Sequence, residues 1–274
     1  MPEAGHRIEG LAERAVLDLQ DGQAHPRQDQ LAEEVPVALH YDDTPYSVMM
    51  ASPGDLEDFA VGFSLTELGL GPGDLLGIEV RPELEGWRIS LRTGQAGHPR
   101  EPRQLPGRSG CGLCGSRSLE EVLRRPAQVG AGAVISAQAL ESALESLHQR
   151  QPLNAATGAL HAAAWCDASG RLLLVREDIG RHNALDKLVG AMQRQATPTA
   201  EGFALVTSRA SYEITLKAAA AGMPFIAAVS APTALAVDLA RACGLTLVGF
   251  ARPGRQVVYS HPQRFGAAGA GDAR

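Results

Sequence analysis

Residues 203–250 read FALVTSRASYEITLKAAAAGMPFIAAVSAPTALAVDLARACGLTLVGF. Three short apolar segments, FALVTS, FIAAVS and LTLVGF, alternate there with two segments of helical spacing. Short apolar runs are typical of strands that are buried on both faces of a parallel sheet. The first helical segment ends at Gly222, and the second opens at Pro232 and ends at Gly244, which is the usual asymmetry of helix ends. This alternation predicts a largely parallel sheet with helices packed on it.

The rest of the chain predicts further elements around this sheet. Residues 160–178 form two strand patterns around a turn, and residues 182–193 have the spacing of a helix. Residues 33–50 have the pattern of a hairpin that turns at 42–45. A helix pattern follows, for which Ser52 is the expected N-cap.

The same patterns predict the domain boundaries. Residues 1–30 are polar and without periodicity, so we expect a mobile tail there. A smaller α+β subdomain and a long loop are expected over 31–108, and the sheet domain over 109–265, with a cysteine loop at its start. The last residues, 266–274, are expected to be a second tail.

Composition limits the class of protein. The 274 residues are 45% hydrophobic but only 4% aromatic, which predicts an aliphatic core, and the net charge of −6 argues against a nucleic-acid partner. No segment approaches the roughly 20 apolar residues of a membrane helix, and the N-terminus has no signal-peptide core. We therefore expect a cytoplasmic protein without a membrane partner. Its four cysteines are too few for a disulfide scaffold, and Cys166 and Cys243, in apolar contexts, are expected in the core.

The other two cysteines lie in the stretch RSGCGLCGSR, residues 108–117. It ends a segment, 93–116, that is rich in Gly, Pro and Arg and has no apolar repeat. Half a zinc site, a thioredoxin-type pair, an inert turn and a reactive thiolate are the possible interpretations. Zinc needs four ligands and there is no second CxxC, while a thioredoxin pair would follow a strand directly. The flanking arginines favour a thiolate at Cys111 or Cys114, and we assign no metal.

Three further regions carry more polar residues than packing requires. Charged residues crowd the passage from strand to helix at 176–188, and others follow the strands that end near 207 and 250. Helix starts and loop arginines both suit phosphate groups. Each region also has a purely structural alternative. The charged residues at 176–188 could cap a helix, His161 could be a core residue, and the loops after the strands could be surface turns. The candidate residues are His161, Arg181, His182, Ser208, Arg209, Arg252 and Arg255.

Five strings stand out together: SGCGLCG (109–115), TGALHAAA (157–164), REDIGRHNALDKLVG (176–190), SRASYEITLKAAAAGMPFIAAVSAPTALAVDLA (208–240) and LTLVGFARPGR (245–255). They resemble the FdhD family, the sulfurtransferases that active formate dehydrogenase requires. The resemblance runs from about residue 31 to about residue 265. It implies a cytidine deaminase-like mixed α/β fold with an additional N-terminal subdomain, and a homodimer.

The resemblance also implies a function. A cysteine desulfurase would pass sulfur to Cys111 as a persulfide, with Cys114 as its neighbour. The protein would bind the bis(molybdopterin guanine dinucleotide) molybdenum cofactor and deliver sulfur to it for formate dehydrogenase, and guanine nucleotide would bind as a mimic. The cofactor contacts that match the family motif are Phe250, Ala251, Arg252, Pro253, Gly254 and Arg255.

Two rival functions were compared with this one. A zinc-dependent nucleotide deaminase needs H-x-E and P-C-x-x-C, and neither motif occurs in the chain. A cofactor-binding chaperone with structural cysteines stays open. The role of Cys114 also stays open: it could accept the sulfur from Cys111, attack the persulfide so that sulfide is released and a disulfide is left, or merely support Cys111.

Overall fold

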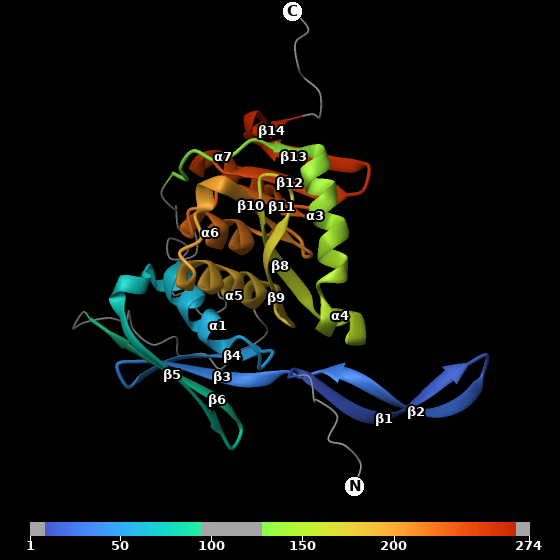
Figure 1. The fold of residues 1–274 in the computed structure, drawn as a ribbon. Coiled ribbons are helices and arrows are strands. Elements are labelled where there is room, and N and C mark those ends of the chain that lie inside the picture. Colours follow the sequence, from blue (N-terminus) through green and yellow to red (C-terminus); the bar gives the residue numbers. More distant parts are fainter. Residues whose placement is uncertain (1–8, 95–127, 267–274) are drawn as a thin grey trace, which may run out of the picture.

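The computed structural model describes residues 9–94 and 128–266, which fold into two packed regions and a projecting hairpin (Figure 1). Residues 1–8, 95–127 and 267–274 lie outside this description, and with them the boundary predicted at residue 109. None of the described helices is both long and apolar enough to cross a membrane.

The C-terminal region is built on a six-stranded sheet in the order β13-β12-β11-β10-β8-β9. The strands β10, β11 and β12 are parallel, and the other neighbours are antiparallel, so the sheet is mixed. This confirms the strand–helix series predicted over 203–250. The strands are β8 (His161–Asp167), β9 (Leu172–Asp178), β10 (Gly202–Val206), β11 (Phe225–Ala228), β12 (Thr246–Arg252) and β13 (Arg255–Ser260).

Helices cover both faces of this sheet. Along β10, Phe203 and Leu205 join the cluster packed under α3 (Ala137–Gln149), whereas Ala204 and Val206 join the cluster on the other face. That second cluster is made with α5 (Arg181–Arg194), α6 (Tyr212–Ala220) and α7 (Ala234–Cys243). Burial on both faces explains why the strand sequences are uninterrupted apolar runs. The smaller elements are α4 (Pro152–Thr157), η3 (Thr199–Glu201), η4 (Pro262–Arg264) and the pair β7 (Ile135–Ser136) with β14 (Phe265–Gly266).

The N-terminal region is a four-stranded sheet with one helix packed on it. Its strand order is β4-β3-β6-β5, and β3 and β4 form the hairpin predicted to turn at 42–45. The helix α1 (Leu56–Phe63) continues into one π-helical turn, η1 (Ser64–Leu68). The other elements are β3 (Val35–Tyr41), β4 (Thr44–Ala51), η2 (Pro72–Asp74), β5 (Leu75–Glu83) and β6 (Gly86–Thr93).

Two glycines let this helix dock against the C-terminal region. A Cβ atom added to Gly62 of α1 would lie 1.8 Å from the carbonyl oxygen of Asp186 in α5, and one added to Gly190 would lie 1.8 Å from the carbonyl oxygen of Asp58. No other residue fits at either position without separating the helices. The helices α1 and α5 therefore join the two regions.

The prediction of a mobile tail over residues 1–30 is wrong for the part that the structure describes. Strands β1 (Leu11–Gln20) and β2 (Gln23–Ala32) form an antiparallel hairpin. Its turn is Asp21–Gly22, with φ of 51° and 79°, and Asp-Gly is a preferred pair for a two-residue hairpin turn. The alternation of Ala15, Leu17 and Leu19 before that turn is the strand pattern that the sequence prediction overlooked.

Candidate functional site

The candidate site lies at the edge of the large sheet where β10, β11 and β12 end. Ala163 of β8 pairs with Val206 of β10, so the start of β8 lies at this same edge. The loop after β10 bridges to the loop after β11, and the Phe250 N–H of β12 donates to the Ser230 carbonyl at 3.1 Å. The topology thus brings the segments around His161, Ser208, Arg209 and Phe250–Arg255 to one edge. Such an edge is where open α/β sheets place their ligands.

His161 and Arg181 are neighbours at this edge. His161 pairs with Asp178, the last residue of β9, and Arg181 begins α5 after a short crossing. Burial lowers the pKa of His161, and the charge of Arg181 lowers it further against an opposing effect of Asp178. The imidazole is therefore neutral around pH 7, and Arg181 supplies the positive charge on this side of the edge.

The β12–β13 hairpin supplies two more arginines. Arg252 Nε donates to the Val229 carbonyl at 3.3 Å, and the Arg255 guanidinium lies over the Phe250 ring, 4.8 Å from its centroid. Phe250 has a φ of 48°, which is uncommon for a residue other than glycine, and functional sites are where such conformations cluster. Gly254 has a φ of 73°, so the Pro-Gly turn needs a glycine there.

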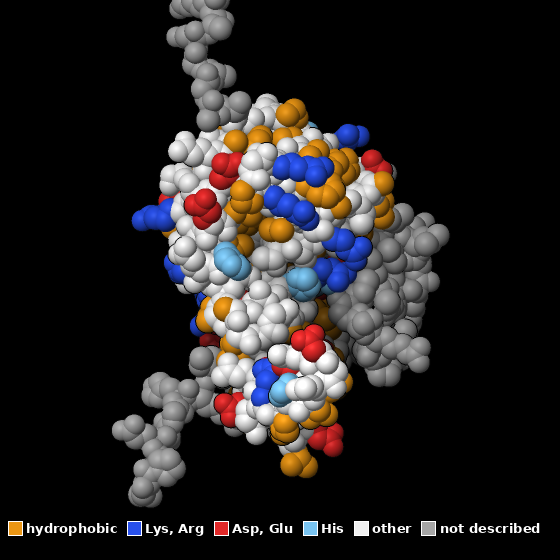
Figure 2. All heavy atoms as spheres, turned by 90° about the vertical axis from the view of Figure 1, so that its right-hand side faces the viewer, with side chains coloured by type: hydrophobic (Ala, Val, Ile, Leu, Met, Phe, Trp, Pro, Cys, Tyr) orange, Lys and Arg blue, Asp and Glu red, His pale blue; other side chains and the backbone are white. Residues whose placement is uncertain are grey.

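Glu141 of α3 holds this hairpin turn from the side. Its Oε1 accepts from Gly254 N and from Gln256 Nε2, each at 3.0 Å, and these bonds lower the pKa of the carboxyl. Figure 2 shows Lys, Arg and His side chains on the face that carries the β12–β13 turn, which lies at the right of Figure 1, with some Asp and Glu side chains among them.

Three helices begin at the same edge. Each of α5, α6 and α7 follows a strand that ends there, so their positive N-terminal dipole ends point to it. Ser211 Oγ accepts from Ile214 N at the start of α6, and Thr233 Oγ1 accepts from Ala236 N at the start of α7. The start of α5 has no side-chain cap. Helix starts and arginines together suit an anionic ligand with more than one charged group.

The buried carboxylate of Asp178 holds the short connection between β9 and α5, which positions Arg181. Its Oδ1 accepts from Gly180 N at 2.7 Å and from Asn183 Nδ2 at 3.0 Å. Its Oδ2 accepts from Ser52 N at 2.9 Å and lies 2.7 Å from Lys187 Nζ. The charged cluster predicted at 176–188 is therefore in part a support for the site.

Ser52 belongs to this support and does not cap a helix. The prediction that it is the N-cap is wrong, because Asp55, with a φ of 55°, precedes α1. The Ser52 hydroxyl instead accepts from Ile179 N at 3.2 Å, and its carbonyl accepts from Lys187 Nζ at 2.9 Å. The N-terminal region thus helps to fix the β9–α5 crossing.

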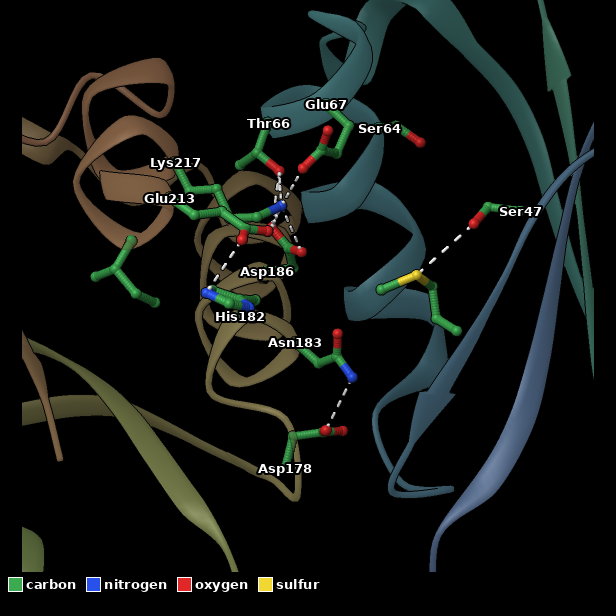
Figure 3. A network of polar contacts seen from close by, with 12 residues as sticks. Ser47, Ser64, Thr66, Glu67, Asp178, His182, Asn183, Asp186, Glu213 and Lys217 are labelled. Atoms are coloured by element: carbon green, nitrogen blue, oxygen red, sulfur yellow. Dashed lines mark hydrogen bonds and ion pairs between the residues drawn. The ribbon is translucent and has the colours of Figure 1, made fainter. Parts of the chain in front are cut away.

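Some predicted site residues point away from the edge. His182 is only 2% exposed, and its Nε2 lies 3.3 Å from Glu213 Oε2, inside the polar network of Figure 3. The Ala251 side chain is completely buried in the core cluster beside α3, so only its backbone is available to a ligand. Ser208 is 4% exposed, and its hydroxyl donates to the Arg209 carbonyl at 3.1 Å.

That polar network, between α1–η1, α5 and α6, was not predicted from the sequence. Lys217 Nζ lies 2.8 Å from Glu67 Oε1, 2.9 Å from Asp186 Oδ2 and 3.0 Å from Thr66 Oγ1 (Figure 3). The partners of Lys217 named here lie 31 to 151 positions from it in the chain, so no local pattern connects them to it. The network lies between the two regions and fixes α5, whose first residue is Arg181.

The four cysteines fall into two groups. Cys166 and Cys243 are buried, as predicted, and burial raises the pKa of each thiol. Such thiols are poor nucleophiles because they stay protonated. Cys111 and Cys114 lie outside the described residues and remain the candidates for thiol chemistry.

Comparisons with known proteins agree on one family. The model of the FdhD/NarQ family matches residues 32–266. A sulfur carrier protein FdhD of Xanthomonas campestris pv. campestris is 52% identical over 260 residues, which are 93% of this chain and 92% of the relative. One of Cupriavidus necator is 49% identical over 254 residues, which are 91% and 88% of the two chains.

A solved structure has the same fold. It is the crystal structure of a protein from Desulfotalea psychrophila that is described as a formate dehydrogenase accessory protein. The TM-score is 0.76 at 25% identity, and the match covers 93% of this chain and 99% of the other. Sequence and structure thus lead to the same conclusion: this chain belongs to the FdhD/NarQ family.

Proposed function

We propose that this protein is a sulfur carrier that serves formate dehydrogenase. It accepts sulfur from a cysteine desulfurase as a persulfide on Cys111 and transfers it to the bis(molybdopterin guanine dinucleotide) molybdenum cofactor before that cofactor is inserted. The observation that carries the proposal is the sheet edge, where arginines and three helix starts converge on a place for an anion. The names of the relatives, sulfur carrier protein FdhD, support the same function.

The loading step is a thiol displacement. The Cys111 thiolate attacks the outer sulfur of the desulfurase persulfide, a new S–S bond forms, and the donor cysteine leaves as a thiolate. The transferred sulfur keeps its oxidation state, so this step needs no separate oxidant or reductant. The glycines around Cys111 and Cys114 allow the backbone the freedom that such an approach requires.

The cofactor would lie at the sheet edge. Its guanine dinucleotide arms carry phosphates, which guanidinium groups bind in a bidentate fashion. Arg252 and Arg255 would contact phosphate, with Arg181 and Arg209 on the far side of the edge. The Arg255 guanidinium, which lies over the Phe250 ring, offers a flat surface on which a guanine ring could stack.

The chain that follows the two cysteines enters the C-terminal region at the opposite edge of the sheet. Gln128 Nε2 donates to the Ala242 carbonyl, and Val129 N donates to that of Cys243, at the C-terminal end of α7. The seven residues of β12 separate this end from the candidate site, a distance of about 23 Å. Cys111 precedes Gln128 by 17 positions, so chain length alone permits a reach of about 56–61 Å. One cysteine could therefore serve both a donor protein and the cofactor edge.

Three finer assignments belong to this proposal. The mixed sheet with helices on both faces supports a cytidine deaminase-like domain. A homodimer and a cytoplasmic location are proposed on the family resemblance, together with the desulfurase and formate dehydrogenase as partners.

Replacing Arg252 and Arg255 together by alanine is expected to weaken binding of GDP by at least about 100-fold. Charge-assisted bonds contribute about 1.5–3 kcal/mol each, and 1.4 kcal/mol corresponds to a tenfold change in Kd. GDP represents one arm of the cofactor and can be titrated by calorimetry without molybdenum.

The matched control is Arg81→Ala/Arg171→Ala. These side chains are 69% and 75% exposed, and Arg171 lies at the far end of β8 from His161. The control removes the same charge from the protein but none from the edge, so its GDP affinity should equal that of the wild type. Equal affinity of the Arg252/Arg255 variant and the wild type would show that the edge does not bind the nucleotide.

A further inference from the structure

The β1–β2 hairpin projects from the body of the molecule (Figure 1). Each strand has 10 residues, and the body meets the hairpin near its root, at α4. Towards the tip, Leu17 is 60% exposed and Leu19 is 68% exposed. We call this hairpin, residues 11–32, the arm.

The arm has two different faces. Leu17 pairs with Pro26 and Leu19 with Ala24, and these four residues, with Ala15, form an uncharged apolar face. The opposite face is ionic. Arg27 Nε lies 3.3 Å from Asp18 Oδ2, and Arg27 Nη1 lies 2.9 Å from Asp29 Oδ1. Since side chains alternate along a strand, the sequence itself separates the two faces.

An uncovered arm of this kind is poorly stabilised. An isolated two-stranded hairpin is marginal in water, and independent stability needs a third strand or another packing surface. The charged side chains of the ionic face form ion pairs within the arm. The leucines of the apolar face contribute free energy only if another surface removes them from water. The apolar face therefore requires a cover from another molecule.

We propose that this cover is a second copy of the chain, and that two arms are exchanged around a two-fold axis. The free part of a strand beyond the buried root, Glu13–Gln20, is about 26 Å long and a two-stranded ribbon is about 10 Å wide, so one arm face covers about 260 Å². One arm on an unrelated partner would bury about 520 Å² in total, below the size of specific interfaces. Two arms, each on the other chain, bury about 1,040 Å², above the roughly 1,000 Å² that a biological interface needs.

The same chain carries a surface that can receive the arm. A groove of about 800 Å³ lies at the arm's root, where Glu9 lines it. Five consecutive residues of β9, Leu173–Glu177, line it as well, so the groove runs along this edge strand of the sheet. Leu173 is 39% exposed there, and Pro152 and Leu153 form an apolar part of a groove whose other lining residues are mostly polar or charged. Edge strands are usually covered or paired.

The position of the groove makes the exchange reciprocal. Because arm root and groove are adjacent, a two-fold axis beside the middle of the arm places the tip of each arm over the groove of the other chain. All arms and grooves are then used, and the assembly closes at two copies. The inference rests on the proposed homodimer and gives it an interface.

The test is the mass of the full chain in solution, measured by sedimentation equilibrium at micromolar concentration. Leu17→Glu/Leu19→Glu should halve the mass from dimer to monomer, with an unchanged circular dichroism spectrum because both side chains are exposed. The matched control, Gln20→Glu/Gln23→Glu, adds the same charge to the ionic face and should remain a dimer. Leu173→Glu, in the groove, should also give the monomer mass.

The outcomes separate this inference from the proposed function. A monomeric wild type would overturn both the arm exchange and the homodimer. A dimeric wild type with a dimeric Leu17→Glu/Leu19→Glu variant would overturn the arm exchange alone. If only Leu173→Glu remained a dimer, the groove would be excluded as the receiving surface.

Discussion

Cys111→Ala is expected to abolish the gain of one sulfur atom that the wild-type protein shows after incubation with a cysteine desulfurase and cysteine. The persulfide needs a thiolate that can reach the donor, and the described cysteines, Cys166 and Cys243, are buried and protonated. Intact-mass spectrometry under non-reducing conditions measures the gain directly. The expected effect is therefore complete loss of the sulfur adduct, since Cys114, whether it accepts the sulfur or resolves the persulfide, acts only after Cys111 has been loaded.

Two variants complete this experiment. Cys243→Ala removes a buried thiol and should leave the sulfur gain unchanged, which controls for nonspecific loading. Cys114→Ala should keep the gain, and a higher yield than in the wild type would indicate that Cys114 normally resolves the persulfide. An equal gain in Cys111→Ala and wild type would exclude Cys111 as the carrier. No gain in the wild type would favour the cofactor-binding chaperone with structural cysteines.

The core of the fold could be predicted from the sequence because its patterns are local. Each strand over 203–250 is a short apolar run, and each helix between them has its own start and stop residues. The arm was equally readable, through the alternating residues around Asp21–Gly22. It was missed because its outer half has no buried face, so its composition is that of a polar tail.

The candidate site was predictable only in part. Arg181 and His182 are adjacent in sequence and were predicted together, yet successive residues of a helix are turned by about 100°. Arg181 therefore lies at the sheet edge beside His161, while His182 points into the interior toward Glu213. Motif matching shows which segment is special, but the helix geometry decides which of its side chains a ligand can reach.

Lys217→Met is expected to lower the free energy of unfolding by about 3–5 kcal/mol, the usual effect of breaking a buried ion pair by removing one partner. Lys217 is 2% exposed, and its ammonium is the cation between the carboxylates of Asp186 and Glu67 (Figure 3). Burial by itself would lower the pKa of Lys217, but the charges of Asp186, Glu67 and Glu213 outweigh burial and raise it. Methionine keeps most of the volume and removes the ammonium group with its charge and its hydrogen bonds. Urea denaturation at pH 7.5 measures the difference.

A matched variant tests whether charge, not packing, causes the loss. Lys217 forms direct ion pairs with two acids, so Glu67→Gln removes one acid and keeps the pair of Lys217 with Asp186. Its cost should be well below that of Lys217→Met, which leaves two acids without a cation. Equal costs for the two variants would contradict the electrostatic explanation, because a packing defect does not depend on which charge is removed.

The electrostatic explanation also predicts how the stability deficit of Lys217→Met changes with pH. Burial already raises the pKa of Asp186 to about 6 in the wild type, against the lowering effect of Lys217. Without Lys217 that lowering effect is lost, so the pKa of Asp186 rises further above its unfolded value. A carboxyl whose folded pKa is raised destabilises the fold above that pKa, and the penalty disappears as the pH falls through it. The deficit of Lys217→Met should therefore be largest at pH 7.5 and smaller at pH 5, whereas a deficit that is independent of pH would mean that the buried carboxylates are not its source.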